Sequence, residues 1–320
     1  MKLQTQIPLK QEANQINYDS NLLLLGSCFV ENIGKKFDYY KFQSLQNPFG
    51  ILFQPKAIEK LILKSVKKEN FTEKDIFFLN ERWHCFDVHS DLSNSSKEKL
   101  LSNLNQALDS TLQQLNNSTH IIITLGTAWL YRFKKTNSLV ANCHKVSQNQ
   151  FLKELLPVDE IANSLENSVK QIRKINNEAT VIFTISPVRH LKDGFVENQQ
   201  SKAHLIAAIH QFLNYKSDIV NCKSLYFPSY ELMMDELRDY RFYAKDMIHP
   251  NETAISYIWE KFKQVWIDEK SFSTMEEVES IQKGLSHKPF NPNSEQHQFF
   301  LETLSKKINY LQKAYPNIQF

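Results

Sequence analysis

The chain has 320 residues, long enough to bury the core of one large α/β domain with an appendage. Hydrophobic residues make up 42% of it and charged residues 23%, a balance typical of folded globular proteins that argues against wholesale disorder. The formal net charge of +3 is too small to predict nucleic-acid binding from charge alone.

The N-terminal segment does not have the composition of a targeting signal. Residues 1–21 are polar and lack the apolar stretch of a secretory leader. The longest apolar runs, such as 22–25 and 121–123, are far shorter than the roughly 20 residues that span a bilayer. The four cysteines form no CxxC pair and lie far apart, at Cys28, Cys85, Cys143 and Cys222. We therefore expect a cytoplasmic protein with reduced thiols and no membrane partner.

The first pattern along the chain is that of a strand, a tight turn and a helix. The apolar run 22–25 is followed by Gly26, and apolar residues then recur at helical spacing over 30–37. A helix candidate at 57–66 and an aromatic, strand-like stretch at 76–88 come next. These two segments fit the scheme poorly and are expected to decorate the main domain.

The alternation of strands and helices then returns. Residues 120–125 read as a strand, 161–172 as a helical stripe and 180–185 as a β-branched strand, followed by a helix at 203–213 and a strand at 224–227. Because strands joined through helices are crossovers, this order predicts a mainly parallel sheet in a flavodoxin-like, three-layer α/β/α sandwich. Such sheets bind ligands at the carboxyl ends of their strands.

The main domain is expected to close with a strongly amphipathic helix. Pro250 precedes an apolar stripe at 254–266, and proline suits the first turn of a helix. We expect a main domain at 1–270 with an inserted decoration at about 51–97. Residues 271–320 are expected to form a helical extension that packs on it or, alternatively, serves self-association.

Ser27 is the first residue of chemical interest. It follows Gly26 at the end of a predicted strand, where the N-terminal amides of the next helix point. A serine hydroxyl is a poor nucleophile at neutral pH, so it needs a base within reach and donors for the oxyanion. The alternative is a serine that only caps the helix.

Asp246 and His249 form the second candidate. Their three-residue spacing in a tight loop lets the carboxylate reach one imidazole nitrogen while the other faces a substrate. That arrangement stabilises the imidazolium formed when a serine proton is taken. The alternative is a His and an Asp that are each satisfied locally at a helix start.

Several segments, taken in order, resemble the GSCFA-domain family, a bacterial branch of the SGNH hydrolase superfamily. The most specific is Gly26, Ser27, Cys28 and Phe29. The others are Asn47 to Gly50, Trp83 to Ser90, Thr124 to Trp129, Asn142 to Lys145, and Ser186 to His190. The resemblance runs from about Leu24 to His249 and covers most of the main domain.

The resemblance implies a role for each block. The nucleophile of SGNH hydrolases falls on Ser27, and their paired aspartate and histidine fall on Asp246 and His249. Gly50 matches the glycine whose backbone N–H helps to form the oxyanion hole. The same comparison adds His89, in the block that begins at Trp83, to the candidate substrate-binding residues.

The third block departs from the superfamily pattern. SGNH enzymes ordinarily carry Gly-x-Asn at the end of a central strand, but Gly126 is followed by Thr127 and Ala128. Thr127 could donate to the oxyanion instead, or Asn142 or Asn47 could reach in from a loop. Loss of one such donor typically costs about 100- to 1000-fold in rate, so weak activity is expected.

The segment from Asn142 to Lys145 places an acceptor, a thiol, an imidazole and a cation in consecutive positions. We expect Asn142, His144 and Lys145 to line the mouth of the pocket, and Lys145 or Arg189 to bind an anionic group of the substrate. The alternative is a surface hairpin with ordinary polar residues. No pair of histidines or cysteines has the spacing of a known ligand motif, so no metal and no cofactor is expected.

Cys28 is an alternative nucleophile because a thiolate at a helix N-terminus is reactive. Adjacent residues at a turn point in different directions, and the resemblance favours Ser27, so Cys28 is expected to be buried under the helix. The sequence therefore predicts a serine esterase that acts through an acyl-enzyme on a carbohydrate or another small O-acyl ester. An O-acyltransferase with the same triad, or a non-catalytic binding protein, remains the alternative.

Overall fold

The computed structural model of the chain describes residues 4–215 and 223–320. Cys222 lies outside the described residues, whereas Cys28, Cys85 and Cys143 are free thiols. Within the described residues, no helix is both long and apolar enough to cross a membrane. Cys28 is half-buried rather than buried.

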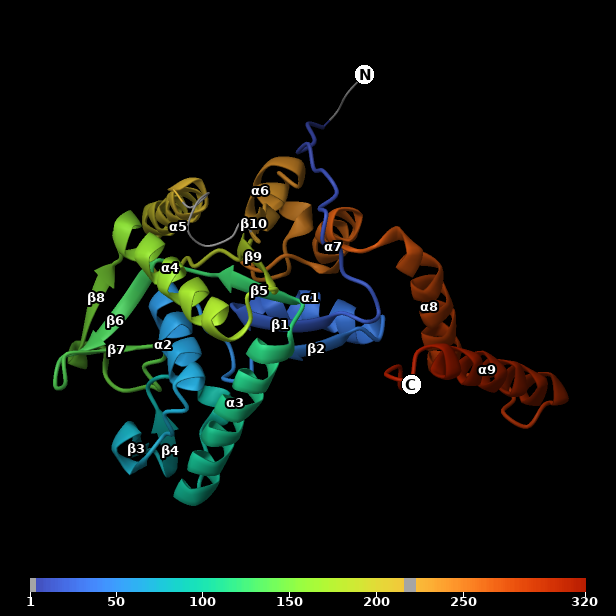
Figure 1. Cartoon of the computed structure of the whole chain (residues 1–320), viewed down its shortest axis with the longest axis horizontal. Coiled ribbons are helices and arrows are strands. Elements are labelled where there is room, and N and C mark those ends of the chain that lie inside the picture. The colour runs from blue at the N-terminus through green and yellow to red at the C-terminus, as the bar shows by residue number, and fades with distance from the viewer. Residues whose placement is uncertain (1–3, 216–222) are drawn as a thin grey trace.

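A five-stranded parallel sheet forms the centre of the molecule, in the order β10-β9-β5-β1-β2 (Figure 1). Its strands are β1 (Asn21–Gly26), β2 (Gln43–Gln46), β5 (His120–Leu125), β9 (Thr180–Ile185) and β10 (Ser224–Phe227). Four of these strands match predicted ones. β2 was not predicted, because its sequence QSLQ is polar and it lies half-buried at the sheet edge.

Helices cover both faces of this sheet, which confirms the three-layer α/β/α prediction. Leu23 and Ile121 face a core shared with α2 (Pro55–Val66), α3 (Lys97–Asn117), α4 (Val158–Ile175) and α5 (Phe195–Tyr215). Leu22 and Ile122 face the opposite core, with α1 (Cys28–Tyr39) and α7 (Glu252–Trp266). Side chains alternate along a strand, so strands that are apolar throughout are buried on both faces.

Two small antiparallel sheets lie beside the sandwich (Figure 1). The hairpin β3 (Ile76–Leu79) and β4 (Arg82–Cys85) corresponds to the predicted strand-like stretch, which turns back at Asn80 and Glu81. The sheet of β7 (Ser138–Val140), β6 (Trp129–Phe133) and β8 (Phe151–Leu155) was not predicted. Helix α2, expected to be part of the decoration, instead packs in the layer with α3 and α4.

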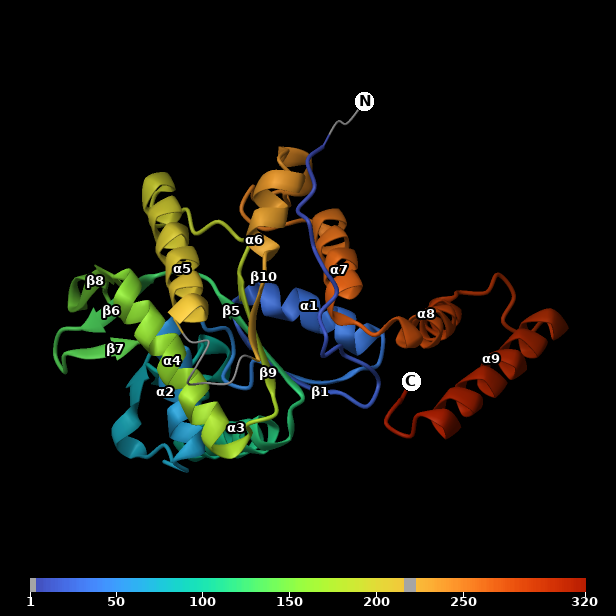
Figure 2. The ribbon, with the colours of Figure 1, turned by 45° about the horizontal axis from the view of Figure 1, so that its top comes forward.

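The C-terminal segment consists of α8 (Phe272–Ser286) and α9 (Glu295–Ala314). Figure 2 shows both helices extending from the end of α7, on the side of the sheet that carries α1. Gln282 of α8 donates to the carbonyl of Tyr39, and Tyr315 packs against Tyr18 with ring centroids 5.1 Å apart. The predicted helical extension therefore contacts the main body along α1.

Short helical turns complete the chain. They are α6 (Ser229–Glu231), a π-helical turn at Leu232–Glu236, and 3₁₀ turns at Glu73–Asp75, Ser90–Leu92, Gln148–Gln150, Tyr240–Phe242 and Glu269–Ser271. The segment from α6 to Phe242 joins the end of β10 to the loop that carries Asp246 and His249. It therefore lies at the carboxyl ends of the strands, where parallel α/β folds bind ligands.

Candidate active site

The turn at Gly26 and Ser27 is fixed by backbone contacts to the neighbouring strand. Gly26 has a φ of +137°, and a Cβ added there would lie 2.1 Å from the carbonyl oxygen of Thr124. Only glycine fits such a close approach at positive φ. The N–H of Ser27 donates to the same carbonyl at 3.1 Å, so this N–H is engaged in the sheet edge.

Ser27 is the N-cap of α1. Its Oγ accepts from the N–H of Phe29 at 3.4 Å, and the residue is completely buried. The capping role considered from the sequence is therefore present in the structure. This contact is long for a hydrogen bond, so the hydroxyl is weakly held.

Asp246 and His249 form a close pair, as their spacing suggests. One oxygen of Asp246 accepts from the N–H groups of Ile248 and His249, at 2.9 and 3.0 Å, and the other lies 2.6 Å from Nδ1 of His249. These three contacts lower the pKa of Asp246 to about 2. The carboxylate stays charged at neutral pH and holds the proton of the imidazole on Nδ1.

His249 and Ser27 are not hydrogen-bonded to each other anywhere in the described part of the chain. Arg189, which follows β9, ties the His249 loop to the sheet through its N–H to Ile248 O (3.2 Å) and Nη1 to Met247 O (3.1 Å). Ser27 follows β1, and β5 separates β1 from β9. Two strand spacings of roughly 4.8 Å therefore separate the ends of β1 and β9, a distance of about 10 Å.

Asn47 is the polar side chain that adjoins the Ser27 turn. Its Oδ1 accepts from the N–H of Gly26 at 2.8 Å, and its own N–H donates to Leu24 O at 2.9 Å. Its Nδ2 is buried and has no hydrogen-bond partner within residues 4–215 and 223–320. A buried amide without a partner is costly, and this one lies next to the candidate nucleophile.

Gly50 adopts a φ of +71° in the turn that follows, and a Cβ there would lie 2.4 Å from Cβ of His89. Its N–H donates to Asn47 O at 2.7 Å. The predicted role of this N–H in the oxyanion hole therefore requires the turn to open. His89 itself lies against the turn and contacts Asp91 at 3.1 Å.

The hydroxyl of Thr127 makes its hydrogen bonds with residues outside the Ser27 turn. Its Oγ1 lies 3.0 Å from the hydroxyl of Ser201 and accepts from the N–H of Trp129 at 3.1 Å. Both contacts hold the hydroxyl against α5 and the start of β6. Thr127 was one of three oxyanion donors considered from the sequence, with Asn142 and Asn47, and its hydroxyl is already hydrogen-bonded.

The segment 142–145 packs against the β3–β4 hairpin. Asn142 accepts from the N–H of His144 at 2.9 Å, and Nε2 of His144 lies 2.6 Å from Cys85 O. Burial lowers the pKa of His144 to about 4, which keeps its ring neutral. Among the described residues, no hydrogen bond or ion pair joins Asn142, His144 or Lys145 to Ser27 or His249. Their predicted place at the pocket mouth stays a prediction.

Lys202 and His190 adjoin the site and were given no role from the sequence. Lys202 is buried, and its Nζ donates to the carbonyls of Gly126 (2.7 Å) and Ser186 (2.8 Å), just past β5 and β9. Burial lowers its pKa to about 7. Nε2 of His190 is buried without a partner in the described part of the chain, and burial lowers its pKa to about 3.

A sequence signal existed for both residues. Lys202 occupies the same helix face as the buried Leu205, Ile209 and Phe212, so a charged residue continues the apolar stripe of α5. A buried lysine needs hydrogen-bond acceptors, so the stripe predicts that such acceptors exist. The sequence does not show which residues they belong to. His190 ends the Ser186 to His190 block already noted for its resemblance.

Within the described residues, no group of three or more His, Cys, Asp or Glu side chains could hold a metal ion.

Comparison with known proteins gives one clear result. A family model described as the GSCFA family matches residues 21–262. A second model, described as the C-terminal domain of GSCFA domain proteins, matches residues 278–320. A search of curated proteins finds no match.

Proposed function

Since the chain belongs to the GSCFA family, we propose that it hydrolyses esters by the acyl-enzyme route of SGNH hydrolases. Ser27 is the nucleophile, His249 the general base and then the general acid, and Asp246 the residue that orients His249. The substrate is a carbohydrate or another small molecule with an O-acyl group.

The observation that carries this proposal is the contact of 2.6 Å between Asp246 Oδ2 and His249 Nδ1. With the proton on Nδ1, the other ring nitrogen has its lone pair free to accept the proton of a hydroxyl. Nε2 of His249 has no hydrogen-bond partner within the described residues. The side chain of His249 is partly exposed, so this nitrogen is open to a substrate.

Asn47 supplies the oxyanion donor in this proposal. Its Nδ2 is buried and unpaired beside Gly26 and Ser27, whereas the N–H groups of Ser27 and Gly50 already donate to carbonyls. An unpaired donor aimed at the place where negative charge develops costs no reorganisation when the reaction occurs. Asn47 thus takes the part of the asparagine that is absent after Gly126.

The reaction proceeds in two steps. Ser27 Oγ bonds to the ester carbonyl carbon while its proton passes to His249 Nε2, and collapse of the intermediate passes that proton to the leaving alcohol. Water then gives a proton to His249 and its hydroxide to the acyl carbon, and as the bond to Ser27 Oγ breaks, His249 returns that proton to Oγ and the acid is released. The long capping contact of Ser27 Oγ breaks as the hydroxyl turns toward His249, since catalytic hydrogen bonds often form only with substrate bound.

The complete burial of Ser27 favours one rival, a non-catalytic binding protein that keeps the fold. An O-acyltransferase shares every step up to the acyl-enzyme and replaces water by an acceptor hydroxyl. Labelling with a fluorophosphonate probe separates the binding protein from both enzymes, because only an activated serine reacts.

The decisive experiment measures probe labelling and hydrolysis of p-nitrophenyl acetate by the full chain and three variants. Ser27→Ala and His249→Ala should lose both signals. Cys28→Ala should keep them, because burial raises the pKa of the Cys28 thiol and leaves little thiolate. Equal labelling and turnover in all three variants would remove the proposal.

A further inference from the structure

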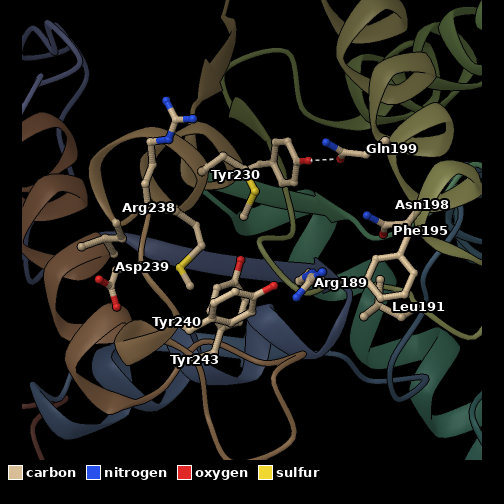
Figure 3. Close-up of a pocket in the computed structure, with 13 residues that line it drawn as sticks. Arg189, Leu191, Phe195, Asn198, Gln199, Tyr230, Arg238, Asp239, Tyr240 and Tyr243 are labelled. Atoms are coloured by element: carbon tan, nitrogen blue, oxygen red, sulfur yellow. Dashed lines mark hydrogen bonds between the residues drawn. The ribbon is translucent and has the colours of Figure 1, made fainter.

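A cavity of about 340 Å³ lies beside the His249 loop and has no role in the reaction steps above (Figure 3). Three segments form its walls: the residues after β9, the first turn of α5, and the stretch from α6 to Tyr243. Its volume falls within the range of about 300–1,000 Å³ that is usual for small-molecule sites. It opens at the carboxyl ends of β9 and β10.

The cavity lies beside the loop that carries His249, although His249 itself does not line it. Tyr243, which lines it, forms an isolated antiparallel bridge with Pro250, and the N–H of the next residue, Ala244, donates to His249 O at 2.7 Å. Arg189, which also lines the cavity, holds Met247 and Ile248 of the same loop. A ligand in this cavity therefore lies next to the loop that carries His249.

The cavity carries an excess of positive charge. Arg189 and Arg238 line it, and Figure 3 shows them on opposite sides. The acidic lining residue Asp239 is already neutralised, because it contacts Arg241 Nη2 at 3.0 Å and accepts from the N–H of Arg241 at 2.8 Å. In the described part of the chain, Arg238 has no hydrogen bond or ion pair, and Arg189 donates from its side chain only to Met247 O. Guanidinium groups with free donors bind carboxylates and phosphates well.

Aromatic rings form the remaining walls. The Arg189 guanidinium lies 5.5 Å from the ring centroids of Phe195 and Tyr243 and 5.9 Å from that of Tyr240. These rings limit the rotamers of Arg189 and present flat faces to a ligand. Tyr230 donates to Gln199 at 2.5 Å, which places a hydroxyl and an amide at the far wall (Figure 3). Flat faces beside hydroxyl and amide groups suit a sugar ring better than a purely apolar group.

We infer that this cavity binds an anionic sugar, with its ring against Tyr240 and Tyr243 and its carboxylate or phosphate at Arg189, while Arg238 attracts the same anion from the other side of the cavity. That this sugar is the O-acylated substrate of Ser27 rests on the proposed function. The binding itself does not, so the two can be tested apart.

Calorimetric titration of the full chain with glucose 6-phosphate, glucuronate, glucose and phenyl phosphate tests the inference without any turnover. We expect one or both anionic sugars to bind at least about tenfold more tightly than glucose and more tightly than phenyl phosphate, with affinity that falls as salt rises. The better of the two anionic sugars tells whether phosphate or carboxylate is preferred. Arg238→Gln and Arg189→Gln should each weaken that binding about tenfold.

The matched control is Lys192→Gln, an exposed lysine next to the lining residue Leu191 that does not itself line the cavity. It removes the same charge and should change the affinity less than threefold. Anionic sugars that bind no better than glucose, phenyl phosphate that binds more tightly than both, or arginine variants that bind like the Lys192 variant would each overturn the inference. Tight sugar binding by a protein that fails the fluorophosphonate test would remove the esterase and leave the sugar site.

Discussion

Substitution of Asp246 by Asn changes one group of the pair that orients His249. In the structure the carboxylate accepts three times, from two backbone N–H groups through Oδ1 and from Nδ1 of His249 through Oδ2. Asparagine keeps one oxygen for the backbone but turns an NH₂ group toward Nδ1. The imidazole must then carry its proton on Nε2, which is the atom that has to accept from Ser27.

The expected loss follows from this change of tautomer. In serine hydrolase triads the same exchange lowers kcat by about 10,000-fold while the geometry is kept. The pKa of Asp246 is about 2, so the wild-type carboxylate is charged above about pH 3 and contributes no titration to the rate between pH 5 and 9. The deficit of the Asn variant should therefore be present across that whole range.

The assay is kcat for p-nitrophenyl acetate from pH 5 to 9, with circular dichroism to confirm folding. Asp235→Asn serves as the control, because this substitution removes the same charge. Asp235 is exposed and makes no hydrogen bond or ion pair within the described residues. We expect it to keep the wild-type rate within twofold. A folded Asp246→Asn protein whose rate stays within tenfold of wild type would refute the assigned role of this pair.

Three further predictions concern the surroundings of the site. Asn47→Asp keeps an acceptor for the N–H of Gly26 but removes the Nδ2 donor, so kcat should fall about 100-fold or more with little change in KM in steady-state kinetics. Gly26→Ala places a methyl group 2.1 Å from Thr124 O at a φ of +137°, and urea denaturation should show a loss of more than about 2 kcal/mol or no folded protein. The pKa of Lys202 is about 7 in the fold against an ordinary value of 10.5, so between these pH values the unfolded chain binds the extra proton and stability rises with pH. The difference in unfolding free energy between wild type and Lys202→Met should therefore grow in favour of wild type from pH 7 to 10, and a flat difference would contradict the shift.

The sequence predicted those parts of the fold whose pattern is local. Segments such as 120–125 and 180–185 are largely apolar, and the helix at 254–266 has a clear apolar stripe. These patterns were enough to predict a parallel sheet between two layers of helices. The edge strand β2 has no apolar pattern, and the sheet formed by β6, β7 and β8 lies outside the strand and helix alternation. β2 was missed because its place depends on pairing with β1, and the second sheet was missed because its strands are short and largely half-buried or exposed.

The candidate site divides in the same way. The contact between Asp246 and His249 follows from three-residue spacing, and it is present. The choice among Thr127, Asn142 and Asn47 could not be made from the sequence, because it depends on which loop crosses the end of β1. The burial of Ser27 was not predicted either, since it depends on the packing of residues that follow β2.

The segment 47–53 joins the separate parts of the site into one network. Asn47 binds Gly26 through its side chain, Leu52 N–H donates to Gly26 O at 2.9 Å, and Phe53 O accepts from Gly126 N–H at 2.7 Å. These contacts fix the turn before Ser27 on the ends of β1 and β5. The backbone beside the serine is thus rigid on this side, which suits an oxyanion donor that must be placed before the reaction begins.

The opposite side of the site depends on Arg189. This side chain lines the cavity and also donates to Met247 O in the His249 loop. An anion bound at Arg189 therefore meets the same guanidinium that positions the backbone two residues before His249. The His249 loop is held to the residues after β9 by the two contacts that Arg189 makes with Met247 and Ile248. In the proposed reaction, substrate binding and the placement of the base thus act through one arginine.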